Sequence, residues 1–211
     1  MAGYVIRQSR KIMTDIKFKE LGVVEYIETY DAMMELIASQ PSFHSIWSLE
    51  HFPVFTIGIS EKEIIEDKSK SPPFIRTARG GKTPFHAPGQ MVIYFILNMK
   101  KLPFPPTELT KKILETTSEA LASYDLKHNI SARDPGIFID SEKVASIGMR
   151  IKKNYSYHGL SININTDLDK FNSIKPCGLD VQACNLKDYI NINVDKFKKE
   201  LLKNFQHMLS K

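Results

Sequence analysis

The run MVIYFILNM at residues 91–99 is the longest nearly uninterrupted apolar segment of this 211-residue chain. It is far shorter than the roughly 20 apolar residues that a helix needs to cross a bilayer. Its length and its content of β-branched and aromatic residues predict a buried strand instead. The chain must therefore fold around at least one buried strand.

Strand patterns outnumber helix patterns in the rest of the chain. Strand-like segments are KFKELGVVEY, SIWSLE, PVFTIG, PFIRTA, GIFID, KVASIGMRI and YSYHGLSININ. Helical spacing is found in IETYDAMMELIASQ, in TELTKKILETTSEALASY and in the C-terminal segment, where Asn193 is a candidate N-cap. GIFID and KVASIGMRI are joined by a short turn, as in a β-hairpin. The sequence predicts an α/β (α+β) sandwich with a mixed sheet and flanking helices.

Length and cysteine content restrict the class of protein. No linker-like segment divides the chain, so a single domain over residues 1–211 is expected. A domain of this size can bury roughly 70% of the surface of its unfolded chain without help from disulfides or metal. Cys177 and Cys184 are only seven positions apart, too few and too close for a disulfide framework or a structural zinc site. A reducing compartment is expected.

The net charge of +5 favours an acidic partner. No aromatic-plus-basic or recognition-helix pattern accompanies the charge, so nucleic acid is not expected as the partner. The N-terminal segment has basic residues but no apolar core, which excludes a secretory signal, and Asp15 disfavours a matrix-targeting peptide. We therefore expect a cytoplasmic protein without a membrane partner, rather than one of the mitochondrial matrix.

Four stretches combine glycine, histidine and reactive side chains more densely than packing requires. They are RGGKTPFHAPGQ (79–90), EKVASIGMR (142–150), YHGLS (157–161) and KPCGLD (175–180). The first places irregular backbone directly before the buried strand, a common position for loops that line sites. An isolated glycine pair is more often a simple turn, so only the combination of stretches indicates a site.

Lys143 and Cys177 are the candidate reactive side chains. Lys143 precedes the small residues of ASIG, which let a ligand approach the backbone, and a partly dehydrated lysine there can act as a base. Cys177 lies in a Pro-Cys-Gly turn that leaves room for a bulky group, and a nearby cation would favour its nucleophilic thiolate. The alternatives are a solvated hairpin lysine and an inert packing thiol. Cys184 in VQACNL is expected to be such a packing thiol.

In this order, the four stretches resemble the lipoyl(octanoyl) transferase family, which transfers octanoyl groups from acyl carrier protein to other proteins. LEHFP at 49–53 is similar to the family's LEH-x-P segment, and RGGKTPFHAPGQ is similar to its RGG-x-x-TYHGPGQ loop. KVASIGMR, HGLSININ and the final PCG complete the resemblance, which runs from about residue 20 to about residue 190. Pro84, Phe85 and Ala87 depart from the family's Thr, Tyr and Gly.

The resemblance implies an acyltransferase on the α/β fold shared with biotin and lipoate protein ligases, with 1–211 as its catalytic domain. It implies that Cys177 carries the acyl group as a thioester and that Lys143 is its dyad partner, the group that favours the thiolate. The positions implied to contact the substrate are Arg79, Gly80, Gly81, Lys82, Thr83, Pro84, Phe85, His86, Ser146, Ile147, Gly148, Gly159, Leu160 and Ser161.

The resemblance also implies the partners, in the pathway of lipoate biosynthesis and protein lipoylation. The donor would be octanoyl-acyl carrier protein, and the acceptors would be lipoyl domains of 2-oxoacid dehydrogenase complexes and the glycine cleavage H protein. No cofactor, ATP or metal is implied, because the donor is already a thioester. These partners are typically acidic, which agrees with the positive charge of the chain.

Two alternative functions remain open at the level of sequence. One is an ATP-dependent lipoate or biotin protein ligase on the same fold, which would need no nucleophilic cysteine. The other is a non-catalytic module that binds acyl groups or carrier domains, which the altered PFHA segment favours and the intact Cys–Lys pair disfavours.

Overall fold

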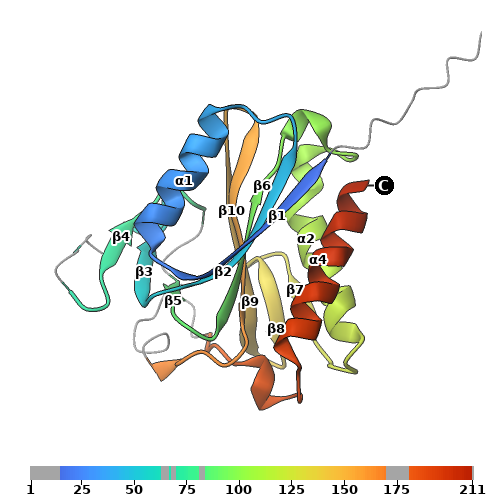
Figure 1. The fold of residues 1–211 in the computed structure, drawn as a ribbon. Coiled ribbons are helices and arrows are strands. Elements are labelled where there is room, and N and C mark those ends of the chain that lie inside the picture. Colours follow the sequence, from blue (N-terminus) through green and yellow to red (C-terminus); the bar gives the residue numbers. More distant parts are fainter. Residues whose placement is uncertain (1–14, 63–66, 68–69, 81–83, 170–180, 211) are drawn as a thin grey trace, which may run out of the picture.

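A computed structural model describes residues 15–62, 67, 70–80, 84–169 and 181–210. Within these residues a seven-stranded mixed sheet has the order β1-β2-β6-β10-β9-β8-β7, and a three-stranded sheet has the order β4-β3-β5. Figure 1 shows the large sheet in the middle of the molecule with helices on both faces. The mixed-sheet α/β (α+β) architecture predicted from the sequence is confirmed.

The strands include every segment that the sequence patterns predicted as a strand. They are β1 (Ile16–Val24), β2 (His44–His51), β3 (Val54–Ile57), β4 (Phe74–Arg76), β5 (Phe85–His86), β6 (Gln90–Ile96), β7 (Asn129–Ser131), β8 (Gly136–Ile139), β9 (Glu142–Lys152) and β10 (Tyr155–Asn163). The predicted buried strand is β6, whose residues are all buried and which pairs antiparallel with β2 and β10. β1 pairs parallel with β2, which makes the sheet mixed.

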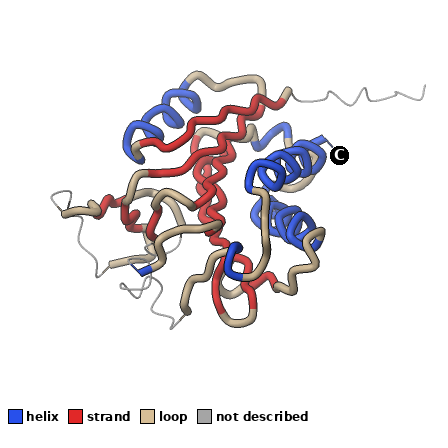
Figure 2. The backbone as a smooth tube through the Cα atoms, turned by 60° about the horizontal axis from the view of Figure 1, so that its bottom comes forward, coloured by secondary structure: helices blue, strands red, loops and turns tan. Residues whose placement is uncertain are grey.

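Helices cover the two faces of the large sheet unequally. The α-helices in the described residues are α1 (Tyr26–Ala38), α2 (Leu109–Ala122) and α4 (Val194–Ser210). Short 3₁₀ helices are η1 (Met99–Lys101), η2 (Pro106–Glu108) and η3 (Leu186–Asp188). Figure 2 shows α2 and α4 side by side on one side of the strands and α1 on the other. The main core lies between the sheet and the α2–α4 pair, and α1 closes a smaller core on the opposite face.

The alternation of side chains along β6 supplies both cores. Met91, Ile93 and Phe95 belong to the α2–α4 core, whereas the intervening Val92 and Tyr94 face the α1 side. The small sheet packs around its own buried cluster, and Figure 1 shows β3, β4 and β5 beside the N-terminal end of α1. The small sheet thus packs against α1, where Tyr26 lies in one buried cluster with Val54 and Ile75.

Two short strands were missed by the sequence patterns, whereas one helix start was predicted. β5 and β7 were not predicted, because strands of two or three residues are too short to show a period. The start of α4 was predicted correctly, since the Asn193 side chain accepts a hydrogen bond from the Lys196 backbone N–H at 3.0 Å.

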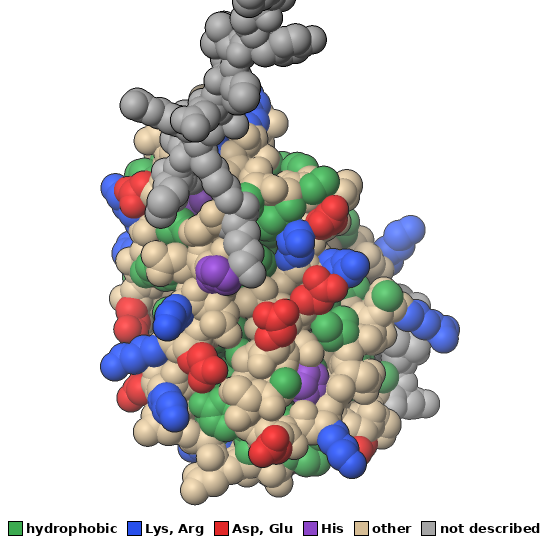
Figure 3. Space-filling view, turned by 90° about the vertical axis from the view of Figure 1, so that its right-hand side faces the viewer, with side chains coloured by type: hydrophobic (Ala, Val, Ile, Leu, Met, Phe, Trp, Pro, Cys, Tyr) green, Lys and Arg blue, Asp and Glu red, His purple; other side chains and the backbone are tan. Residues whose placement is uncertain are grey.

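Charges of both signs share the face formed by α2 and α4. Figure 3 shows lysine and arginine side chains interspersed with acidic ones on that side of the molecule. On α2, Lys111 and Lys112 lie 3.6 and 3.7 Å from Glu115 and Glu108, as expected of an exposed helix surface. In the described part of the chain, no helix combines the length and apolar character needed to cross a bilayer.

Phe205→Ala should lower the free energy of unfolding by about 3–5 kcal/mol, because the fully buried ring packs edge-on against Phe95 at 4.9 Å between ring centres. Phe18→Ala is the matched control, since that ring on the edge strand β1 is 41% exposed. Its loss should stay below about 1 kcal/mol. Urea unfolding of the two variants measures both values, and equal losses would contradict the packing of α4 on the sheet.

Candidate active site

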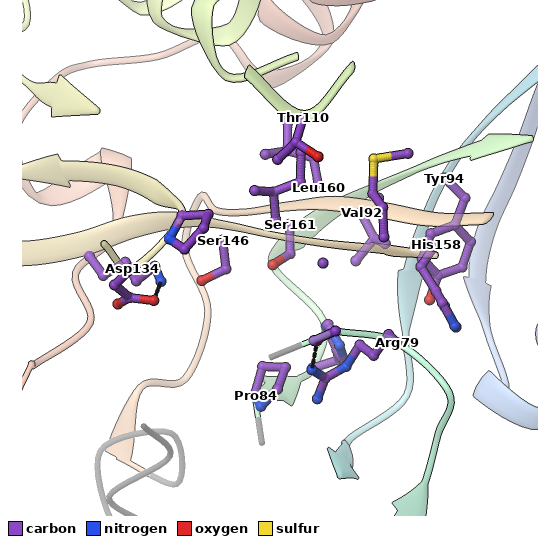
Figure 4. A pocket seen from close by; sticks show the side chains of 18 of the residues that line it. Arg79, Pro84, Val92, Tyr94, Thr110, Asp134, Ser146, His158, Leu160 and Ser161 are labelled. Atoms are coloured by element: carbon purple, nitrogen blue, oxygen red, sulfur yellow. Dashed lines mark hydrogen bonds and ion pairs between the residues drawn. The ribbon is translucent and has the colours of Figure 1, made fainter. Parts of the chain in front are cut away.

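A cavity of about 270 Å³ lies against β6, β9 and β10 of the large sheet, and residues from both faces of the sheet contribute to its lining. The residues that line it include Arg79, Gly80, Pro84, His86, Val92, Tyr94, Asp134, Lys143, Ser146, Ile147, Gly148, Met149, His158, Gly159, Leu160, Ser161 and Val181. Figure 4 shows Asp134 at one end and Tyr94 and His158 at the other, with Ser161 and Val92 between them. Segments that are far apart in the sequence therefore meet at one concave surface.

Small residues in two cross-strand pairs form the floor of the cavity. Gly148 of β9 lies opposite Gly159 of β10, and Ser146 lies opposite Ser161 on the same face. A side chain at Gly159 would collide with the backbone oxygen of Ile93 on the neighbouring strand. The cavity exists because these four positions carry almost no side-chain volume.

A β-bulge turns Lys143 toward this cavity. Ile137 pairs with Ala145, but the next residue of β8, Phe138, pairs with Lys143, so Val144 is an extra residue on β9. Val144 and Ala145 both belong to the α2–α4 core. Without the bulge, strict alternation would place Lys143 on that core face. With it, the lysine lines the cavity.

Lys143 is buried and paired with Asp134. The Lys143 side chain is 9% exposed, and its Nζ lies 2.7 Å from Oδ1 of Asp134 and 5.4 Å from the centre of the Phe138 ring. Gly136 makes room for the lysine, since a Cβ there would lie 2.5 Å from the lysine Cε. Sequence patterns did not identify Asp134, which lies in a turn and not in any of the four stretches.

Arg79 is held within the wall of the cavity. Its Nε donates to the hydroxyl of Thr56 at 3.1 Å, and its Nη1 donates to the carbonyl of Gly80 at 2.9 Å. Nη2 donates to the hydroxyl and to the carbonyl oxygen of the same threonine. These contacts fix the start of the RGG loop against β3.

A buried hydrogen-bond chain connects His86 with the segment beside Lys143. The amide of Gln90 donates to the carbonyl of Phe85 at 3.2 Å and to Oδ1 of Asn163 at 2.9 Å, so its oxygen must be the acceptor that lies 2.6 Å from Nδ1 of His86. Asn163 then donates to the carbonyl of Cys184 at 3.1 Å. The chain sets the tautomer of His86, with the proton on Nδ1 and a lone pair on Nε2.

The imidazoles at the cavity are uncharged at neutral pH. Burial lowers the pKa of His86 and His158 to about 3 and that of His51 to about 4, and Arg79 also disfavours the cationic forms of His86 and His158. The ring of His158 stacks on Tyr30 at 5.8 Å. Among the described residues, no three acidic, histidine or cysteine side chains are grouped as a metal site would require.

The structure brings together most of the site positions that were predicted and are described. Arg79, Gly80, Pro84, His86, Lys143, Ser146, Ile147, Gly148, Gly159, Leu160 and Ser161 all line the cavity. Phe85 does not line it, because this fully buried ring packs against Phe55 in the core of the small sheet. Cys177, Gly81, Lys82 and Thr83 lie outside the described residues.

The segment that begins at Val181 is anchored at the cavity. Val181 lines the cavity, and the backbone N–H of Lys143 donates to the carbonyl of Gln182 at 2.8 Å. The backbone N–H of Cys184 donates a hydrogen bond to the Lys143 carbonyl at 3.2 Å.

Comparison with solved structures defines the class of fold. Lipoate-protein ligase A bound with ATP superimposes with a TM-score of 0.76 at 15% identity, over 93% of this chain and 86% of that chain. Biotin protein ligase from Aquifex aeolicus in complex with biotin and ATP gives 0.56 at 14% identity, over 92% and 70%. The chain therefore has the catalytic fold of lipoate and biotin protein ligases.

Comparison of sequences identifies the family. The family described as the lipoyl protein ligase A/B catalytic domain matches residues 25–206. An octanoyltransferase from Wigglesworthia glossinidia brevipalpis is 35% identical over 204 residues, which cover 93% of each chain. An octanoyltransferase from Polynucleobacter asymbioticus is 34% identical over 210 residues, covering 90% of this chain and 96% of that protein. The chain belongs to the octanoyltransferase family.

The two cysteines should differ sharply in reactivity. Burial raises the pKa of the Cys184 thiol to about 12, and the neighbouring Glu142 carboxylate adds to the effect, so little thiolate is present near neutral pH. Cys177→Ala, which retains only Cys184, should react with iodoacetamide slowly when folded and rapidly when unfolded in urea. Equal rates in the two states, followed by mass spectrometry, would contradict the burial of Cys184.

Proposed function

We propose that this chain is an octanoyltransferase that moves an octanoyl group from a carrier-protein thioester to the ε-amino group of a lysine, through a thioester on Cys177. The observation that carries the proposal is the position of Lys143, a buried amine on a cavity wall whose backbone is bonded to the segment that follows Cys177. Membership of the octanoyltransferase family supports the same assignment.

The size and lining of the cavity support a short linear acyl chain as the ligand. Its volume of about 270 Å³ lies just below the range of roughly 300–1,000 Å³ that is usual for drug-sized ligands. Val92, Ile147, Met149 and Leu160 provide apolar contacts along it. The glycine and serine floor leaves room for an unbranched chain to lie against the backbone of β9 and β10.

The proposed reaction consists of two balanced exchanges. In the first, the Cys177 sulfur attacks the carbonyl carbon of the donor thioester, the bond to the carrier sulfur breaks, and the proton lost by Cys177 ends on the carrier thiol. In the second, the amine of the acceptor protein's lysine attacks the new thioester carbonyl, the bond from the acyl carbon to the Cys177 sulfur breaks, the amide forms, and one amine proton ends on the Cys177 sulfur. Neither exchange changes an oxidation state or consumes a nucleotide.

Lys143 is proposed to mediate both proton movements. As a cation beside Cys177 it favours the thiolate that attacks the donor, and it can exchange a proton with the sulfur and with the incoming amine. Backbone N–H groups near Cys177 are proposed to hold the oxyanion that forms at each step.

The proposed macromolecular partners follow from this chemistry. The donor is octanoyl-acyl carrier protein, and the acceptors are lipoyl domains of 2-oxoacid dehydrogenase complexes and the glycine cleavage H protein. Their acidic surfaces would be attracted by the net charge of +5. A cytoplasmic location agrees with these partners and stays a prediction.

Octanoyl-acyl carrier protein and an apo lipoyl domain should be sufficient for amide formation without nucleotide. The assay follows the mass of the lipoyl domain, with free octanoate plus ATP as the comparison donor. Modification only with octanoate and ATP would show an adenylate-forming ligase instead. Carrier binding without modification under either condition would show a binding module.

Cys177→Ala should abolish transfer, and Lys143→Ala should slow it by about 10²- to 10⁴-fold, the usual effect of removing a group that moves a proton. The double variant should be no worse than the worse single variant, because the two side chains act as a unit. Lys152→Ala at the exposed end of β9 is the matched control and should match the parent rate. A parent-like rate of Lys143→Ala in a single-turnover assay would contradict the proposed role of Lys143.

A further inference from the structure

We propose that Asp134 is a positioning residue that fixes the Lys143 ammonium at the cavity wall for the first exchange, the formation of the acyl-enzyme. The inference rests on the proposed function. Oδ1 of Asp134 lies 2.7 Å from Nζ of Lys143, and both residues line the cavity. In the described part of the wall, Asp134 is the only carboxylate.

Gly136 and Phe138 pack close to the end of the Lys143 side chain. Gly136 leaves a gap that the lysine Cε occupies, and the Phe138 ring lies 5.4 Å from Nζ. A lysine tip otherwise keeps rotational freedom and has three N–H donors. Asp134 takes one donor and thereby directs the remaining two.

The backbone of Asp134 is itself held in place. Its N–H donates to the hydroxyl of Ser131 at 3.2 Å, at the end of β7, so the carboxylate projects from a closed turn rather than from a free loop. Since Pro135 follows directly, the turn is stiff on both sides of the carboxylate. A rigid anchor of this kind can hold a catalytic group within the narrow range that reaction requires.

The ion pair between Lys143 and Asp134 is not explained by stability alone. Oδ2 of Asp134 is buried and has no hydrogen-bond partner among the described residues. Buried ion pairs with an unsatisfied oxygen are weak contributors to stability, because desolvation offsets the Coulomb attraction. An unsatisfied buried oxygen next to the proposed dyad lysine is therefore better explained by a role at the site.

The test compares Asp134→Ala, Asp134→Asn and the control Asp140→Asn in a single-turnover assay of octanoyl transfer from octanoyl-acyl carrier protein to the enzyme. Asp140 is an exposed acid in the β8–β9 turn, where its φ of 51° is also accessible to asparagine. Asp134→Ala should slow acyl-enzyme formation by about 10- to 100-fold with the KM for the donor nearly unchanged. Asp134→Asn keeps an oxygen but no charge and should be intermediate, and Asp140→Asn should match the parent.

Rescue by formate separates positioning from a structural role. Formate can occupy the space left in Asp134→Ala and supply a carboxylate to Lys143, so the rate should rise with formate concentration and saturate. Lys143→Ala should not respond. A parent-like rate in Asp134→Ala, or a slow rate that formate leaves unchanged, would overturn the proposal.

Folding of the variants and activity of the parent give two further outcomes. If Asp134→Ala does not fold, the isosteric Asp134→Asn decides: a several-fold slower rate at an unchanged urea midpoint supports positioning, and a parent-like rate overturns it. If the parent itself forms no octanoyl adduct, the proposed function fails, which is distinct from failure of the role of Asp134.

Discussion

The register between β9 and β10 is the constraint on which the site depends. It places Gly148 opposite Gly159 and Ser146 opposite Ser161, so that all four small residues share one face. A shift by one residue would turn them to the other face of the sheet and bring larger side chains into the same space. The tight approach of Gly159 to the backbone of Ile93 fixes this part of β10 against β6 as well. The floor of the cavity is therefore a consequence of sheet pairing.

The two faces of the large sheet have different roles: one is packed for stability, and the other contributes buried imidazoles to the candidate site. The face under α2 and α4 is continuously apolar, as the contact of Phe95 with Phe205 illustrates. The opposite face carries buried imidazoles, including that of His158, which lines the cavity. His158, a non-glycine residue, has a φ of 62° there, a conformation that costs about 1–3 kcal/mol and is typical of functional sites. Packing on the first face offsets these costs on the second.

Sequence patterns predicted the structural features that depend on short-range periodicity. They missed the features that depend on strand pairing and tertiary contacts. The buried strand predicted within 91–99 is confirmed as β6, and it followed from residue type alone. Ser146 and Gly148 of ASIG lie on the cavity floor, whereas their contact with a ligand stays a prediction. The bulge at Val144 could not be predicted, since only the pairing partner β8 reveals an extra residue. Asp134 and the bond from Gln90 to Asn163, 73 positions apart, depend on tertiary contact in the same way.

The central claim, that an acyl group is carried on Cys177 beside Lys143, is tested most directly by peptide mapping of the enzyme after incubation with octanoyl-acyl carrier protein alone. The account predicts one octanoyl group on the peptide that contains Cys177, released by hydroxylamine as expected of a thioester. It also predicts no modification of Cys184, whose thiol is buried. An octanoyl group on any other residue, or none at all with an active preparation, would contradict it.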